Sequence, residues 1–139
     1  MAVAIFDPLA GVLSYGLAGH PPPLLRRSRD GKVVRLVDAD GPVLGPIRDA
    51  VYTEGQVKLE RGDILVMYTD GLVERSGRDI ETGISQAELL LASWRSETAL
   101  AQGCRQLTEE LASPPRQDDV CVIAVRLRRG ASQAATQRK

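Results

Sequence analysis

The chain has 139 residues, as many acidic as basic side chains, and a hydrophobic share of 43%. This length suits one domain or part of one, and the hydrophobic share is enough for a packed core. A formal net charge of zero argues against a nucleic-acid partner or an anionic membrane surface. The sequence shows no signal peptide and no apolar stretch of membrane-spanning length, so we expect a cytoplasmic protein.

The N-terminal half is predicted to consist of antiparallel hairpins. Asp30-Gly31 marks the tip of the second hairpin. Asp7 stands in the first turn before a proline, which explains it better than a metal-ligand role. Five strands are expected here, at residues 2–6, 12–17, 24–27, 33–37 and 51–59.

Basic residues gather on the second predicted hairpin, at Arg26, Arg27, Arg29, Lys32 and Arg35. Two interpretations are open for this cluster. It could grip a phosphorylated partner, or it could be the solvated face of an alternating hairpin, which we favour.

Between the two hairpins stands the segment Ala18-Gly19-His20, followed by three prolines. His20 is the single histidine of the sequence, so any imidazole chemistry falls to it. We favour a histidine that fixes its loop by hydrogen bonding. The prolines impose an extended exit without backbone donors.

The most informative stretch is the apolar run Ile64–Tyr68 and the Thr69-Asp70-Gly71 that ends it. A run this short and continuously apolar predicts a strand buried on both faces. An aspartate at the end of such a strand is costly to leave unpaired. Glycine after it allows a sharp turn and a close approach of backbone. A plain Asp-Gly turn is the alternative.

Two helices are predicted in the second half, after a polar loop at residues 75–83. Ser85 to Glu88 has the pattern of a capping box that opens the first helix. Trp94 is expected to anchor the core. Ser96 is expected to cap the second helix, and Pro114-Pro115 to end it.

The second helix has an apolar face made by Leu100, Cys104, Leu107 and Leu111. Cys104 and Cys121, the two cysteines, both stand in apolar patterns. We expect buried thiols, not a disulfide or a nucleophile.

The C-terminal strand, residues 120–125, is predicted to be buried on both faces and follows two acids, Asp118 and Asp119. If this strand is the antiparallel neighbour of Ile64–Tyr68, both acids meet Asp70 at one edge of the sheet. Converging carboxylates without a nearby Lys or His favour a hard cation such as Mg²⁺ or Mn²⁺.

Three motifs, in this order, resemble those of the SpoIIE-type protein phosphatases, bacterial members of the metal-dependent type-2C (PPM) Ser/Thr phosphatase family. The resemblance implies an α+β fold, an antiparallel β-sandwich flanked by helices, with metals at one end. It covers residues 1–127 and matches the C-terminal, larger part of the family's domain. Residues 128–139 are polar and basic, and from this composition we expect a disordered tail. The motifs are Ala18-Gly19-His20-Pro21-Pro22-Pro23-Leu24, Gly62-Asp63-x-Leu65-x-x-Tyr68-Thr69-Asp70-Gly71-Leu72-Val73-Glu74 and Gln117-Asp118-Asp119-Val120.

Matched motif to motif, the resemblance implies that Asp70 and Asp118 hold one Mn or Mg ion. Asp119 would stand behind the metal or orient a metal-bound water, and Gly71 would leave room for solvent. Gly19 and His20 would form a loop of the site, although the family's asparagine two residues before the Gly is replaced by Leu17. In such sites two metals activate water against a phosphomonoester, so no covalent nucleophile is needed.

The family's first metal is held by an aspartate motif that precedes the matched region, so this chain is expected to supply at most part of a two-metal site. Truncation, a split gene product and a degenerate protein remain open. The leading hypothesis is a phosphoprotein Ser/Thr phosphatase acting on a bacterial regulator such as an anti-sigma-factor antagonist. The alternatives are a non-catalytic binding module and a plain α+β domain. An unpaired edge at residues 2–6 also predicts self-association.

Overall fold

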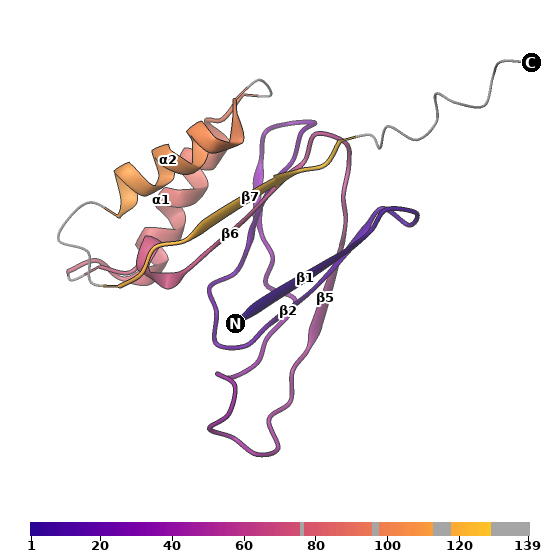
Figure 1. Ribbon diagram of the computed structural model, residues 1–139, viewed down its shortest axis with the longest axis vertical. Helices are drawn as coiled ribbons and strands as arrows, with labels where there is room; N and C mark the ends of the chain where they lie inside the picture. The colour runs from indigo at the N-terminus through magenta and orange to yellow at the C-terminus, as the bar shows by residue number, and fades with distance from the viewer. Residues whose placement is uncertain (76, 96–97, 113–117, 129–139) are drawn as a thin grey trace, which may run out of the picture.

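In the computed structural model, the described residues are 1–75, 77–95, 98–112 and 118–128. They form two antiparallel sheets and two helices, which confirms the α+β class (Figure 1). The first sheet, here called the β1 sheet, has the order β1-β2-β5, with bounds Ala2–Asp7, Val12–Leu17 and Glu54–Lys58. The second, the β6 sheet, has the order β4-β3-β6-β7, with bounds Val33–Arg35, Leu24–Arg26, Ile64–Tyr68 and Val122–Arg126.

The helices all come from the second half of the chain and lie on the outer side of the β6 sheet (Figure 1). A short 3-10 turn, η1 (Asp70–Leu72), follows β6 directly. Helices α1 (Ile80–Ala92) and α2 (Leu100–Leu111) then pack on each other and on the sheet. No described helix combines the length and the apolar character needed to cross a membrane.

Strand β6 is the centre of the core, because its alternate side chains serve two different layers. Ile64, Val66 and Tyr68 pack with the helices, in a cluster that also contains Trp94. Leu65, on the opposite face, belongs to the core between the two sheets. The prediction of a strand buried on both faces is confirmed, and Trp94, 2% exposed, is the expected core anchor.

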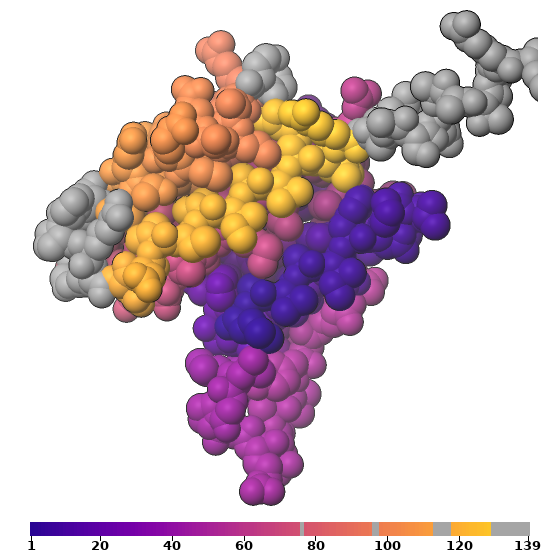
Figure 2. Space-filling model, viewed as in Figure 1, coloured from indigo at the N-terminus to yellow at the C-terminus, as the bar shows by residue number. Residues whose placement is uncertain are grey.

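Strand β7 contradicts its prediction, because only one of its faces is covered. It is an edge strand beside β6, and Ile123 and Val125 are 55% and 56% exposed. Figure 2 shows β7 (yellow) at the surface, between the helices (orange) and β1 (indigo). Val125 lines an open pocket of about 240 Å³ between the sheets. The apolar run of β7 therefore predicted a strand correctly but did not predict how much of it is buried.

Helix α1 begins earlier than predicted, and its cap is a different residue. The Asp79 carboxylate accepts hydrogen bonds from the Thr82 backbone N–H (2.9 Å) and hydroxyl (2.6 Å), so the helix starts at Ile80. Ser85, the predicted cap, lies inside the helix, where its hydroxyl accepts a bond from Arg35. Residues 80–83, expected to be loop, are helical. Buried Gly83 allows this first turn to pack closely on the Val73 carbonyl, because a Cβ on Gly83 would lie only 2.0 Å from that oxygen.

Other boundaries and burial classes differ in smaller ways. Helix α2 begins at Leu100 after Ala99, which makes no side-chain cap bond, whereas Ser96, Pro114 and Pro115 lie outside the described residues. Both cysteines are free, but Cys104 is only partly buried, where a buried thiol was expected. Cys121, however, is exposed, because it stands at the end of an edge strand. Strand β1 lies at the edge of its sheet as predicted, and self-association through that edge stays a prediction.

Candidate functional site

The carboxylate-bearing ends of β6 and β7 meet at one end of the β6 sheet. The two strands are antiparallel neighbours, with Tyr68 opposite Val122 as the last pair of the ladder. Asp70 leaves one strand at the point where Asp118 and Asp119 approach the other. A Cβ added to Gly71 would lie 2.6 Å from the Asp119 carbonyl oxygen and 3.2 Å from that of Asp118. The predicted meeting of the two strand ends is confirmed, and Gly71 is needed because a side chain there would collide with the Asp119 carbonyl. Convergence of the carboxylates themselves stays a prediction.

The three carboxylates at this end are exposed and have few protein partners. One oxygen of Asp70 accepts from the Gly71 backbone N–H at 3.0 Å, and one of Asp118 accepts from the Asp119 backbone N–H at 2.7 Å. Within the described part of the chain, neither these two nor Asp119 forms an ion pair. Free carboxylate oxygens are therefore available to a ligand from solvent.

The chemistry of these donors fits a hard divalent cation, because carboxylate and carbonyl oxygens are the ligands that Mg²⁺ and Mn²⁺ prefer. The described residues nevertheless contain no group of three or more His, Cys, Asp or Glu side chains placed to hold a metal. Asp70 and Asp118 are therefore exposed oxygen donors at neighbouring strand ends. Their metal roles, and that of Asp119, remain predictions.

Thr69 connects the two strand ends and was not singled out by the sequence. Its hydroxyl donates to the Asp119 carbonyl at 2.8 Å and accepts from the Cys121 backbone N–H at 2.9 Å. Its own backbone N–H donates to the Cys121 carbonyl at 3.0 Å. The signal available in the sequence was a hydroxyl immediately before the strand-ending aspartate.

The Gly19-His20 loop lies next to this end of the sheet. His20 lines a pocket of about 150 Å³ together with Thr69 and Cys121. Its Nδ1–H donates to the Pro21 carbonyl at 2.9 Å, in keeping with a loop-fixing histidine. Gly19 has a φ of +56°, and a Cβ there would stand 2.3 Å from a Val43 methyl carbon, so only glycine fits. Leu17 is 8% exposed, in the core between the sheets.

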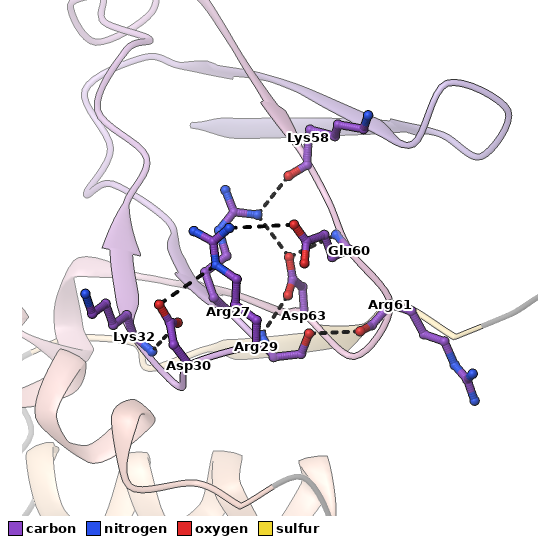
Figure 3. A network of polar contacts seen from close by, with 9 residues as sticks. Arg27, Arg29, Asp30, Lys32, Lys58, Glu60, Arg61 and Asp63 are labelled. Atoms are coloured by element: carbon purple, nitrogen blue, oxygen red, sulfur yellow. Dashed lines mark hydrogen bonds and ion pairs between the residues drawn. The ribbon is translucent and has the colours of Figure 1, made fainter.

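Asp63, at the opposite end of β6, is a structural residue. The residue is 2% exposed. Its carboxylate accepts hydrogen bonds from the backbone N–H groups of Ser28 (2.8 Å) and Glu60 (3.0 Å) and from the Arg27 guanidinium (3.0 Å), as Figure 3 shows. Burial alone would raise the pKa of this carboxyl, but these donors together hold its pKa below the usual value. The network ties the β3–β4 hairpin to the turn before β6.

The basic cluster on the β3–β4 hairpin is largely occupied by carboxylates of the same chain. Arg27 pairs with Asp63, and Arg29 lies 3.8 Å from both Asp30 and Glu60. Arg35 pairs with Glu88 at 2.8 Å and with Glu81 at 2.5 Å, which joins β4 to α1. These pairs weaken the interpretation that the cluster grips a phosphorylated partner.

The comparisons with known proteins agree with this fold and with the motifs around Asp70 and Asp118. The family model described as Stage II sporulation protein E (SpoIIE) matches residues 1–128. The chain belongs to the SpoIIE family. Its solved neighbours include PP2C phosphatase domains, so the α+β sandwich is the phosphatase fold of that family.

Two curated relatives are much longer than this SpoIIE-family chain. The phosphoserine phosphatase RsbU of Bacillus subtilis (strain 168) is 36% identical over 61 residues, which are 44% of this chain and 18% of that protein. Protein IcfG of Synechocystis sp. is 28% identical over 124 residues, 87% of this chain and 19% of the relative. The chain spans about a fifth of the length of these relatives.

Solved structures give the same picture of the fold. The RsbU and RsbW domains of Rv1364c from Mycobacterium tuberculosis match at 31% identity with a TM-score of 0.74, over 91% of this chain and 35% of that one. The phosphatase domain of SpoIIE from Bacillus subtilis, presoaked with Mn, matches at 20% identity with a TM-score of 0.72, over 94% and 56%. RsbX in complex with magnesium matches at 16% identity with a TM-score of 0.61, over 88% and 53%.

Proposed function

We propose that this chain carries the Asp70–Asp118 portion of a metal-dependent phosphoprotein Ser/Thr phosphatase site. The observation that supports the proposal is the close approach of Gly71 to the Asp118–Asp119 backbone, which joins the ends of two strands that carry exposed aspartates. A structural role would require partners for these carboxylates, as Asp63 has, and the described residues provide almost none.

In this proposal Asp70 and Asp118 hold one Mn²⁺ or Mg²⁺ ion, and Asp119 orients water beside it. The ion would activate water and offset charge on the phosphoryl oxygens. Gly71 contributes by its missing side chain, which allows the two strand ends to approach. His20 keeps the neighbouring loop in place through its bond to Pro21.

The names of two relatives support a proposal for the substrate class. RsbU is described as a phosphoserine phosphatase, and the Rv1364c structure combines RsbU and RsbW domains. We therefore propose a phosphoserine on a bacterial regulatory protein, such as an anti-sigma-factor antagonist, as the substrate. Neither a nucleic acid nor a membrane is proposed as a partner, in line with the net charge of zero.

Metal binding tests this function directly. We expect the purified chain to bind Mn²⁺ in a calorimetric titration and the Asp118→Asn variant to lose most of that affinity, because a charged ligand becomes neutral. Asp49→Asn, which changes an exposed loop aspartate, is the matched control and should bind as the wild type does. Equal affinity in all three proteins would contradict the proposed site.

Catalysis by the chain alone is expected to be weak. With part of the ligands for a two-metal site, hydrolysis of p-nitrophenyl phosphate in the presence of Mn²⁺ should hardly exceed background. Strong Mn²⁺-dependent turnover would show that two metals are held by this chain after all.

A second candidate function is a non-catalytic binding module with the phosphatase fold. Leu17, buried where the family pattern has asparagine, favours it. Under this alternative Mn²⁺ would not bind and partner binding would be independent of Asp70 and Asp118. In either case the open edge of β1 predicts self-association, which light scattering at high protein concentration would detect as a mass above the monomer's.

A further inference from the structure

The ladder between β6 and β7 ends in an unusual way at Thr69. In a regular antiparallel pair, Thr69 and Cys121 would exchange two backbone hydrogen bonds. One is present, from the Thr69 N–H to the Cys121 carbonyl at 3.0 Å. The Thr69 carbonyl instead accepts from the Leu72 N–H at 3.0 Å, because the chain already turns into η1. The Cys121 N–H therefore needs another acceptor.

The Thr69 hydroxyl is that acceptor, and it makes a second hydrogen bond to the same segment. It accepts from the Cys121 N–H at 2.9 Å and donates to the Asp119 carbonyl at 2.8 Å. A hydroxyl can act as donor and acceptor at once, and both capacities are used here. The Thr69 side chain is thus hydrogen-bonded to both ends of the segment from Asp119 to Cys121.

These two hydrogen bonds act on the same backbone that touches Gly71. The Asp119 carbonyl held by Thr69 is the oxygen that would lie 2.6 Å from a Cβ on Gly71. Holding that carbonyl sets the distance between the Asp118 segment and the start of η1, where Asp70 stands. The Thr69 hydroxyl therefore helps to fix the distance between the two strand ends that carry these aspartates.

We propose that Thr69 is a positioning residue, whose hydroxyl holds the Asp118–Asp119 backbone against Gly71 and so places Asp118 beside Asp70. The inference rests on the proposed metal site, which it deepens. Thr69 would not itself hold the metal. Its effect would reach a bound ion through the two carboxylates.

The test is Mn²⁺ affinity measured by calorimetry on the full chain and its Thr69→Val variant. Valine keeps the shape of the side chain but has neither donor nor acceptor. We expect a loss of about 10-fold or more, the range typical of groups that orient metal ligands. Thr69→Ser, which keeps the hydroxyl, should restore most of the affinity. Thr69→Ala serves in its place if the valine variant does not fold.

Thr53 offers a matched control at a distance from the carboxylates. Its hydroxyl accepts from the Asp40 N–H at 2.7 Å and donates to the Asp40 carbonyl at 3.2 Å, the same pair of roles. Thr53→Val should leave Mn²⁺ affinity unchanged. Hydrogen exchange gives a metal-free readout, because the Cys121 amide should exchange faster in Thr69→Val and at the wild-type rate in Thr69→Ser.

The outcomes separate the two claims. If Asp118→Asn lowers Mn²⁺ affinity but Thr69→Val behaves like Thr53→Val, the positioning role is wrong and the metal site stands. If serine fails to rescue, the hydroxyl is not the operative group, and the inference fails as well. If the wild-type chain does not bind Mn²⁺ at all, both the proposed function and this inference are overturned.

Discussion

The two ends of strand β6 carry the same residue type in opposite circumstances. Asp63 stands just before Ile64, where the strand begins, and is 2% exposed, with backbone and arginine donors on its carboxylate (Figure 3). Asp70 follows the other end, is exposed, and accepts one bond from the Gly71 N–H. A buried carboxylate is tolerated only when fully paired, so Asp63 has no capacity left for a ligand. Asp70 retains that capacity.

Burial and hydrogen-bond donors decide whether an aspartate of this strand has a structural role. Burial and paired donors turn Asp63 into a joint between the β3–β4 hairpin and the turn before β6. Exposure and a nearby second carboxylate segment make Asp70 a candidate ligand instead. Substitution should therefore affect stability at one end of the strand and metal binding at the other.

The largest effect is expected at Asp63. Asp63→Ala would leave the Arg27 guanidinium and two backbone N–H groups without their acceptor, which should lower the free energy of unfolding by about 3 kcal/mol. Urea denaturation measures this, with Asp49→Ala as the exposed control. Unchanged Mn²⁺ affinity is expected at protein concentrations and temperatures where the variant is folded. A stability loss below about 1 kcal/mol would show that Asp63 is not the structural residue that distinguishes this end of β6 from the Asp70 end.

At the other end, Asp70→Asn should lower Mn²⁺ affinity about as much as Asp118→Asn, by roughly 100-fold, the upper end of the losses typical of groups that only orient ligands. The double variant should add little to either single change, since all remove the same ion. Stability should hardly change, because both carboxylates are exposed. Calorimetric titration and urea denaturation of the three variants check this. Fully additive losses would mean that the two aspartates serve different ions.

A smaller loss is expected at Asp119. Successive side chains of an extended segment point to opposite sides, so only one of Asp118 and Asp119 can face Asp70. Asp119→Asn should reduce Mn²⁺ affinity by about 10-fold, less than Asp118→Asn in the same titration. If Asp119→Asn proved the more damaging, the two aspartates would exchange roles.

The smallest effect concerns pH. Because the pKa of Asp63 is lowered in the folded state, its contribution to stability is complete above the unfolded-state pKa, about 4, and is lost as the pH falls through the lower folded pKa. The stability difference between the wild type and Asp63→Ala should therefore narrow below about pH 4. Urea denaturation between pH 6 and pH 3 measures it. A difference that stayed constant would show that the Asp63 charge contributes little.

The sequence by itself determined the features that local patterns specify. The continuous apolar run of β6, the aspartates at the ends of two strands, and the three motifs in their order predicted the fold, the family and the meeting of the strand ends that carry Asp70 and Asp118. These predictions succeeded because a short apolar run and the abrupt end of a strand are properties of adjacent residues. The same kind of run in β7 predicted a strand but not its burial.

Only the tertiary structure decided what depends on distant partners. Four features depend on which elements become neighbours. They are the edge position of β7, the exposure of Cys121, the packing of the start of α1 on the Val73 carbonyl, and the hydrogen-bond donors around Asp63. Thr69 belongs to this group, since its hydroxyl matters through a segment fifty residues later in the chain. Hydrogen bonds between separated segments leave no periodic trace in the sequence, so their roles emerge only when the chain is folded.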